Sequence, residues 1–126
     1  MLTHLSIRDV VLIDKLDIEF ERGLCVLTGE TGAGKSIVLD ALGLALGARA
    51  ETSLIRAKAD KLSVTASFLL PKRHPALALL AEQDIAAEDD SIVVRRVLSA
   101  DGRGKAFIND QPVSVSLLRT VAERLV

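Results

Sequence analysis

The residues with the clearest chemical potential form one short, glycine-rich stretch near the start of the chain. It fits the pattern G-x-x-x-x-G-K-[ST] at each fixed position, and its residues are Gly29, Glu30, Thr31, Gly32, Ala33, Gly34, Lys35 and Ser36. Glycines at this spacing let successive backbone N–H groups curl around phosphate oxygens, and a following helix directs the positive end of its dipole toward them. The stretch, called the phosphate loop below, therefore predicts the binding of ATP.

Two side chains of the phosphate loop have separate chemical roles. Lys35 is expected to reach the β- and γ-phosphates as a point charge, which makes it our catalytic candidate. The hydroxyl of Ser36 is expected to complete the coordination of a Mg²⁺ ion that bridges the same phosphates. A plain glycine turn with a solvated lysine is the alternative. The complete pattern, between a predicted strand and a predicted helix, argues against that alternative.

Hydrolysis of ATP requires more than this loop, because a carboxylate must hold the metal and another group must orient the attacking water. The apolar run Val10 to Asp14, which ends in an acid, imitates a metal-binding Walker B strand but precedes the phosphate loop. A plain amphipathic strand follows it, so we predict an edge strand and a structural role for Asp14. His4 and His74 have no second ligand at a metal spacing, and the acidic run Glu88 to Asp90 is typical of a solvated loop. No complete hydrolytic or metal site is therefore expected.

Contact with nucleic acid requires a local patch, because the net charge is -1 and the isoelectric point is near 6.1. Tyrosine and tryptophan are absent and aromatic residues make up only 2%, which leaves phosphate contact rather than base stacking. A solvated surface is the favoured interpretation of the basic residues, and a basic face near a predicted hairpin is the alternative. The residues of that face are Lys72, Arg73, Arg95, Arg96, Arg103 and Lys105.

Hydrophobic periodicity predicts the elements that position the phosphate loop. Leu24 to Thr28 is predicted to be a short strand that runs into the loop, and Ser36 to Leu46 is predicted to be a helix. This helix is apolar on nearly every face, so it must be buried on several sides, and Gly47 is its expected C-cap. Upstream, strands around Leu5 to Ile7 and from Leu16 to Phe20 predict an antiparallel edge before the nucleotide site.

The remainder of the chain predicts further strands and helices. One more half-buried strand is followed by a break and a short helix. A β-rich segment, a strong turn and a returning arm then predict a hairpin, and an amphipathic helix follows it. The ranges are Leu62 to Phe68 for the strand, Pro71 to His74 for the break, Pro75 to Gln83 for the short helix, Ser91 to Ser99 and Lys105 to Asn109 for the arms, Asp101 to Gly104 for the turn and Ser116 to Leu125 for the last helix.

The composition suits one compact globular domain with a single core, since 49% of the 126 residues are hydrophobic and 26% are charged. Cys25 is the only cysteine, which excludes an internal disulfide and favours a reducing compartment. The longest apolar stretch, Ile37 to Ala48, is too short to span a bilayer, and the N-terminus lacks the apolar core of a signal peptide. We expect a cytoplasmic protein with no membrane contact. Because no capping residue ends the last helix at Val126, we also expect a part of a longer chain.

With these motifs in place, the chain resembles the N-terminal head segment of the RecN family, bacterial DNA-repair ATPases in the SMC-like branch of ABC-type ATPases. The resemblance covers essentially all residues and is most specific where the phosphate loop continues into a characteristic tail. The similar stretches are Leu27 to Ser36, Asp40 to Leu42, Leu46 and Gly47, Arg49 and Ala50, Leu54 to Arg56, Asp101 to Arg103, Phe107 to Asn109, and Pro112 and Val113. The resemblance implies an α/β P-loop NTPase fold. Residues 1–126 would form the N-terminal lobe of an ABC-type head, with an antiparallel β edge and a buried helix after the phosphate loop.

The resemblance bears on three positions outside the phosphate loop, as a candidate contact residue or as a departure from the family pattern. Arg56 is a candidate for the arginine that such heads place near the nucleotide or DNA, and a surface salt bridge is the alternative. Lys58 stands where the family's glycine is expected after Ile-Arg-x, and Asp110 stands where Asn-Gly is usual. These two departures concern the conformation of loops and leave the resemblance intact.

The resemblance also implies a head assembled from both ends of a long chain that are joined by a coiled coil. Two such heads clamp ATP between the phosphate loop of one and the signature motif of the other. The chain would then hold half a site. The Q-loop glutamine, signature motif, Walker B aspartate, catalytic glutamate and switch histidine lie further along in the family, with the coiled coil and the C-terminal half. The implied partners are DNA, bound weakly by this segment alone, the C-terminal half of its own head, and a second head that associates with ATP.

We therefore expect an ATP-binding segment of an ATPase that acts on DNA ends in double-strand break repair and recombination, in the bacterial cytoplasm at the nucleoid. The segment alone is expected to be inactive, since hydrolysis needs the C-terminal half and head dimerisation. Two alternatives stay open. A self-sufficient P-loop NTPase or nucleotide kinase requires a metal carboxylate and a lid or base-recognition motif, which we do not find. An ATP-gated interaction module would use nucleotide to drive association without catalysis of its own.

Overall fold

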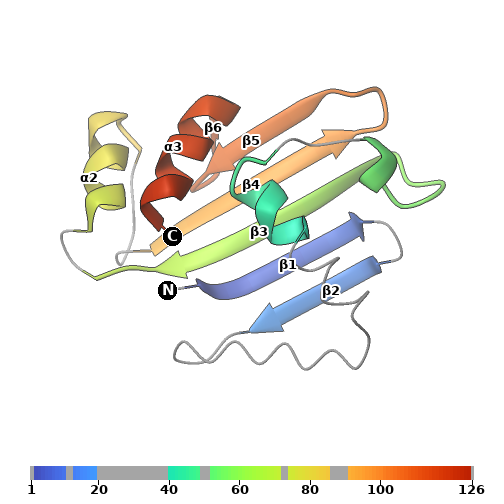
Figure 1. Cartoon of the computed structure of the whole chain (residues 1–126), viewed down its shortest axis with the longest axis horizontal. Coiled ribbons are helices and arrows are strands. Elements are labelled where there is room, and N and C mark those ends of the chain that lie inside the picture. The colour runs from blue at the N-terminus through green and yellow to red at the C-terminus, as the bar shows by residue number, and fades with distance from the viewer. Residues whose placement is uncertain are drawn as a thin grey trace.

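A six-stranded antiparallel sheet forms the centre of the molecule, with its strands in the order β2-β1-β3-β4-β5-β6 (Figure 1). The computed structural model describes residues 2–10, 13–19, 40–48, 52–71, 74–85 and 91–125. The phosphate loop and the strand predicted at Leu24 to Thr28 lie outside these ranges. The strands are β1 (Leu2–Val10), β2 (Ile13–Glu19), β3 (Lys61–Leu69), β4 (Ser91–Ser99), β5 (Gly104–Ile108) and β6 (Gln111–Val113).

The sheet has one buried face because apolar and polar residues alternate along its strands. In β3, the buried side chains are Leu62, Val64, Ala66 and Phe68. Antiparallel pairing places Val64 opposite Ile7 of β1 and opposite Arg96 of β4, which are also buried. The intervening positions of β3 carry Ser63, Thr65 and Ser67, which are partly exposed. We call the side of the sheet that bears these hydroxyls the open face.

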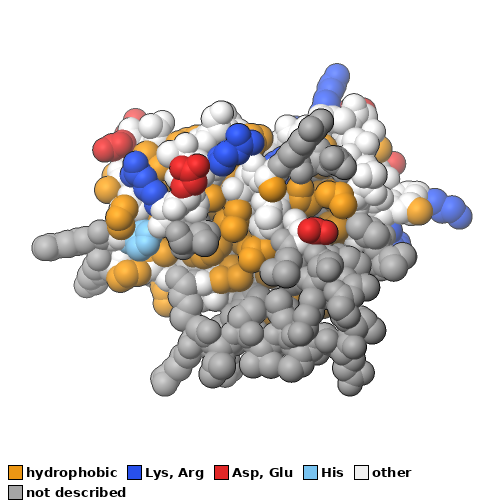
Figure 2. Space-filling model, in the orientation of Figure 1, with side chains coloured by type: hydrophobic (Ala, Val, Ile, Leu, Met, Phe, Trp, Pro, Cys, Tyr) orange, Lys and Arg blue, Asp and Glu red, His pale blue; other side chains and the backbone are white. Residues whose placement is uncertain are grey.

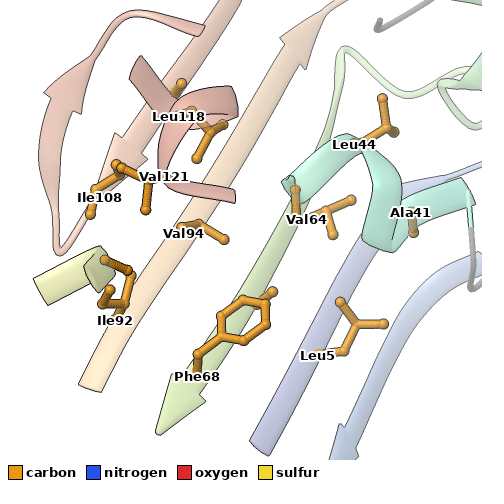
Figure 3. Packing of buried hydrophobic residues seen from close by; sticks show 14 of the residues in the cluster. Leu5, Ala41, Leu44, Val64, Phe68, Ile92, Val94, Ile108, Leu118 and Val121 are labelled. Atoms are coloured by element: carbon orange, nitrogen blue, oxygen red, sulfur yellow. The ribbon is translucent and has the colours of Figure 1, made fainter. Parts of the chain in front are cut away.

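Three helical segments cover the buried face (Figure 1): residues 40–45, α2 (Pro75–Glu82) and α3 (Val115–Leu125). Their apolar side chains join those of the strands in one core, in which full burial of a leucine or valine contributes about 1.5–3 kcal/mol (Figure 3). A short 3₁₀-helix, η1 (Thr52–Leu54), precedes β3. None of the helices that the structure describes is both long and apolar enough to cross a membrane.

The predicted elements are confirmed where the structure describes them. The predicted hairpin is formed by β4 and β5, and the backbone N–H of Arg103 donates to Asp101 Oδ1 across its turn at 2.9 Å. The short helix α2 begins at Pro75 as predicted and ends at Glu82. The predicted antiparallel edge is the pair of β2, at the margin of the sheet, with β1.

One strand, β6, was not predicted from the sequence. Asn109 and Asp110 are the two central residues of the loop that joins β5 to β6, with φ values of 50° and 65°. Positive φ at both positions is the type I′ geometry that matches the twist of a two-residue hairpin. Pro112 lies in β6, an edge strand of the sheet, where a missing N–H group is tolerated. Gln111 to Val113 is too short to show any periodicity.

Candidate nucleotide site

The phosphate loop lies outside the described residues, so its assignment, with the roles of Lys35 and Ser36, stays a prediction from the sequence. Cys25 lies outside them as well. The structure describes the chain again from Asp40, within the helix predicted to follow the loop. It therefore defines how the far end of this helix is held.

The helix at residues 40–45 packs one side against the buried face of the sheet, while Leu42 and Gly43 are partly exposed, so burial on several sides stays a prediction. Ala41, Leu44 and Ala45 are at most 2% exposed and belong to the hydrophobic core. Figure 3 shows Ala41 and Leu44 beside the strands β3 and β1 that carry the core. The helix is therefore anchored along its length to the strands beneath it.

Gly47 ends this helix, and the C-cap prediction is confirmed. Its φ of 99° is a left-handed conformation that favours glycine. The N–H of Gly47 donates to the carbonyl of Leu44 at 3.1 Å, and the N–H of Ala48 donates to the carbonyl of Gly43 at 2.9 Å. This pair of bonds is the Schellman motif, which satisfies carbonyls that the helix leaves without partners. A Cβ at Gly47 would lie 3.1 Å from both Cα and Cβ of Arg119, so the site also requires a small residue.

Two arginines from other elements hold the same helix end. Arg96 of β4 is 5% exposed, and its Nη1 donates to the carbonyls of Leu44 and Ala48 at 3.2 and 3.1 Å. Arg119 of α3 donates from Nε to the carbonyl of Gly47 at 3.3 Å. Burial, and to a smaller extent the nearby Arg119 charge, lowers the pKa of Arg96. A guanidinium remains charged at neutral pH, so both arginines place positive charge at the negative end of the helix dipole.

The burial of Arg96 corrects the basic face considered in the sequence analysis. Arg96 occupies a core-facing position of β4 and is not available to a partner. Arg103 lies in the hairpin turn, with Nε 3.7 Å from Asp101 Oδ2. Arg95 and Lys105 do share a surface, the open face, while Lys72 and Arg73 lie outside the described residues. Every second residue of β4 is buried, Arg96 among them, although the apolar and polar residues of this strand do not alternate in the sequence.

Arg56 forms the surface salt bridge that was the alternative to a functional role. Its Nη1 lies 3.8 Å from Oδ1 of Asp14, and the two side chains are 45% and 76% exposed. A pair this exposed contributes about 0–1 kcal/mol to stability. Asp14 is on β2, so the prediction of an edge strand is confirmed, although the apolar run before it is divided between the ends of β1 and β2. Contact of Arg56 with nucleotide or DNA stays a prediction.

The loop after Arg56 adopts a conformation that favours glycine. Lys58 has φ of 71°, and neighbouring Asp9 has φ of 55°. The backbone N–H of Arg56 donates to the carbonyl of Asp9 at 2.8 Å, which ties this loop to the end of β1. A surface hollow of about 370 Å³ lies here, and its lining includes Arg56, Lys58 and Lys61. The loop therefore keeps the backbone geometry that glycine would adopt easily, with lysine in its place.

The histidines have structural partners in the described part of the chain. Nε2 of His4 lies 3.3 Å from Oε1 of Glu19 on β2. Nδ1 of His74 accepts a hydrogen bond from the N–H of Ala76 at 3.0 Å and thereby caps α2. Among the described residues, no three histidine, cysteine or acidic side chains are grouped as metal ligands. The run Glu88 to Asp90 lies outside those residues.

Sequence comparison relates the chain to DNA-repair proteins. A family model described as an AAA domain matches residues 4–121. DNA repair protein RecN of Haemophilus influenzae is 47% identical over 128 residues, which cover 100% of this chain and 23% of that protein. RecN of Bacillus subtilis is 42% identical and is matched over 99% of this chain and 22% of its own length. The chain thus spans about a quarter of the length of these curated relatives.

Comparison with solved structures relates the fold to ATPase heads. An SMC ATPase structure, from work on ATP-driven dimerisation and DNA-stimulated activation, has a TM-score of 0.77 at 23% identity over 98% of this chain and 78% of its own. The SMC head domain from Thermotoga maritima has a TM-score of 0.65 at 19% identity, over 94% of this chain and 41% of its own. RecF, a recombination mediator, has a TM-score of 0.70 at 16% identity, over 94% of this chain and 29% of its own. The predicted α/β fold of an ABC-type head lobe is confirmed.

Proposed function

Because the chain belongs to the AAA domain family and is a RecN-type head segment, we propose that it supplies the phosphate-binding half of an ATPase site. The full protein would act on DNA in double-strand break repair and recombination, in the bacterial cytoplasm at the nucleoid. Gly29 to Ser36 would hold ATP, with Lys35 on the β- and γ-phosphates and Ser36 on Mg²⁺.

The observation that carries this proposal is a complete phosphate-loop pattern that leads into a rigidly held helix. A phosphate loop binds through backbone N–H groups and a helix dipole, and both act only when the helix keeps its orientation. Here the helix is buried at Ala41, Leu44 and Ala45, and its end is held by the Gly47 cap and by hydrogen bonds from two arginines, Arg96 and Arg119. Such packing supports the nucleotide site, because a plain, solvated glycine turn would not need a fixed helix after it.

We propose that hydrolysis requires parts of the protein beyond residues 1–126. Asp14, which follows an apolar run, pairs with Arg56 at the sheet margin. About three quarters of each RecN relative lies outside the matched region, which is room for a coiled coil and the C-terminal half of a head. The catalytic carboxylates and the signature motif would come from that half and from a second head that associates with ATP.

Titration calorimetry of the chain with ATP and Mg²⁺ tests the nucleotide site. We expect Lys35→Ala to abolish binding while the fold persists, because the lysine is a charge contact on a loop. Lys15→Ala, which removes an exposed lysine of β2, is the matched control and should bind as the wild type does. ATP binding that is as tight in Lys35→Ala as in the wild type would show that the site is assigned wrongly.

Turnover and association measurements separate the proposal from its alternatives. We expect no ATP turnover by the chain above that of its Lys35→Ala variant. Turnover that depends on Lys35 would instead indicate a self-sufficient P-loop NTPase. Light scattering with and without ATP, in the presence of the C-terminal half, then tests association. A mass that rises with ATP supports association of two heads through bound nucleotide, and an unchanged mass counts against it.

A further inference from the structure

We propose that the open face of the sheet carries a binding site for the phosphate backbone of duplex DNA, formed by Arg8, Lys61, Arg95 and Lys105. This proposal deepens the proposed function, since it rests on an action on DNA and names the surface that makes the contact. Four neighbouring strands contribute one cation each: β1, β3, β4 and β5. All four side chains line one hollow of about 400 Å³, and its lining contains one acid, Asp9, beside these four cations.

The strand register sets the spacing of these cations. Arg8 lies opposite Ser63, Ser63 lies opposite Val97, and Val97 lies opposite Lys105. Arg8 and Lys105 are therefore three strand spacings apart, which is about 14 Å. Duplex DNA presents one negative charge per about 1.7 Å of its axis, so a row of this length faces several phosphates.

Most of this positive charge is not neutralised by the protein. Arg8 is paired with Asp17, with 2.9 Å between Nη2 and Oδ1. Lys61, Arg95 and Lys105 have no ion-pair partner within the part of the chain that the structure describes. Three neighbouring cations without ion-pair partners favour an anionic ligand.

Arg95 is also held in a defined orientation. Its Cζ lies 4.3 Å from the centre of the Phe107 ring, which is a stacked cation–π contact. The contact restricts the guanidinium plane before any ligand arrives, so less conformational freedom is lost on binding. The same contact covers one face of the Phe107 ring, so that face is not available to stack on a base. With no tyrosine or tryptophan in the chain, the surface offers phosphate contacts rather than base stacking.

The other face of the sheet has a different character. Figure 2 views the molecule from the helix-bearing side, where lysine and arginine side chains stand apart from one another among hydrophobic patches. The three longer helical segments, residues 40–45, α2 and α3, do not lie on the open face, because their apolar side chains pack into the core on the other side (Figure 1). A second hollow, lined by Arg56 and Lys58, shares Asp9 and Lys61 with the first and extends the basic surface toward the end of β1.

Fluorescence anisotropy with a labelled duplex of random sequence tests the site on the whole chain. The variant Arg95→Gln/Lys105→Gln removes two cations from the open face, and Arg103→Gln/Arg124→Gln removes two exposed arginines elsewhere. We expect the first variant to weaken binding about tenfold and to lower the slope of log affinity against log salt by about 2 between about 50 and 200 mM salt. The second variant should keep the affinity and slope of the wild type. Thermal melts monitor the fold of both.

Three results would overturn the proposal. The first is wild-type affinity in Arg95→Gln/Lys105→Gln. The second is competition by polyglutamate as effective as that by unlabelled duplex, which would indicate a general site for acidic polymers. The third is no binding of duplex at the lowest salt. Because ATP binding is measured separately on the same samples, Lys35-dependent ATP binding without DNA binding would overturn this inference and leave the nucleotide site standing.

Discussion

The guanidinium of Arg96 donates from Nη1 to the carbonyl oxygen of Leu44, at 3.2 Å, across 52 positions of the sequence. A second bond reaches the carbonyl of Ala48 at 3.1 Å. The last carbonyls of a helix lack partners within the helix, so a buried donor is needed where water is excluded. Since this helix is predicted to follow the phosphate loop, we expect the central strand β4 to help fix the orientation of the predicted nucleotide site.

Replacing Arg96 with methionine should destabilise the protein. The change keeps side-chain length but removes two hydrogen bonds from a charged donor, while the Leu44 carbonyl keeps its bond from the N–H of Gly47 and Ala48 is exposed to water. Urea denaturation should therefore show a loss of about 1–3 kcal/mol, and ATP should bind more weakly. Arg103→Met, at an exposed turn position, is the control and should change little. Equal stability of the two variants would mean that the carbonyls find other partners.

Gly47→Ala should lower the free energy of unfolding more than Gly102→Ala does. Both glycines have positive φ, at 99° and 89°, so alanine adds a similar backbone strain of about 1–2 kcal/mol at each. A Cβ at Gly47 would also lie 3.1 Å from the backbone of Arg119, whereas nothing lies within 4 Å at Gly102. The difference in unfolding free energy between the two variants measures this steric contact. A difference near zero would show that α3 moves aside at no cost.

Lys58→Gly and Asp110→Gly should both stabilise the protein, in contrast to most glycine substitutions. Lys58 and Asp110 have φ of 71° and 65°, and a left-handed conformation costs a residue with a side chain about 1 kcal/mol. Lys58→Gly should gain more, because aspartate tolerates this conformation better than lysine does. Lys61→Gly, in β3, is the control and should destabilise. Denaturation midpoints that fall in both Lys58→Gly and Asp110→Gly would show that the positive φ at these positions does not strain the native residues.

The sequence predicted most elements because local patterning and tertiary packing agree in them. The alternation of apolar and hydroxyl-bearing residues in β3 is complete, so burial follows the predicted pattern residue by residue. Gly47 was identified as a C-cap because only a glycine adopts its φ easily at a helix end. The two family departures, Lys58 and Asp110, fall at positions where the structure has positive φ, so the loops keep their shape without the glycines.

What the sequence did not reveal depends on contacts between distant residues. The role of Arg96 arises only when β4 meets the end of a helix far away in the chain. The loop at Asn109 and Asp110 joins β5 to a strand of three residues, which is shorter than the window over which a period is measurable. Likewise, the stacking of Arg95 on Phe107 requires the β4–β5 register, which places the two residues opposite one another.

Asp17 should make stability depend on pH in the acid range. The Ser6 hydroxyl, which donates to it, and then Arg8 hold the pKa of Asp17 below its ordinary value near 3.8. A carboxyl with a depressed folded pKa contributes stability above its unfolded pKa, and that contribution is lost as pH falls through the folded value. Asp17→Asn should therefore be less stable than the wild type at about pH 7 and equal to it near pH 2. A gap that persists in acid would assign the effect to packing.

Variants of Arg56 and Asp14 separate a structural salt bridge from a functional arginine. Because the pair is exposed, Arg56→Gln and Asp14→Asn should each change stability by less than about 1 kcal/mol. If Arg56 contacts nucleotide or DNA, Arg56→Gln should weaken that binding, whereas Asp14→Asn should leave it equal or stronger by releasing the guanidinium. Calorimetry with ATP and anisotropy with duplex measure the two ligands separately. Unchanged affinity for both ligands in Arg56→Gln would leave the residue with its salt bridge alone.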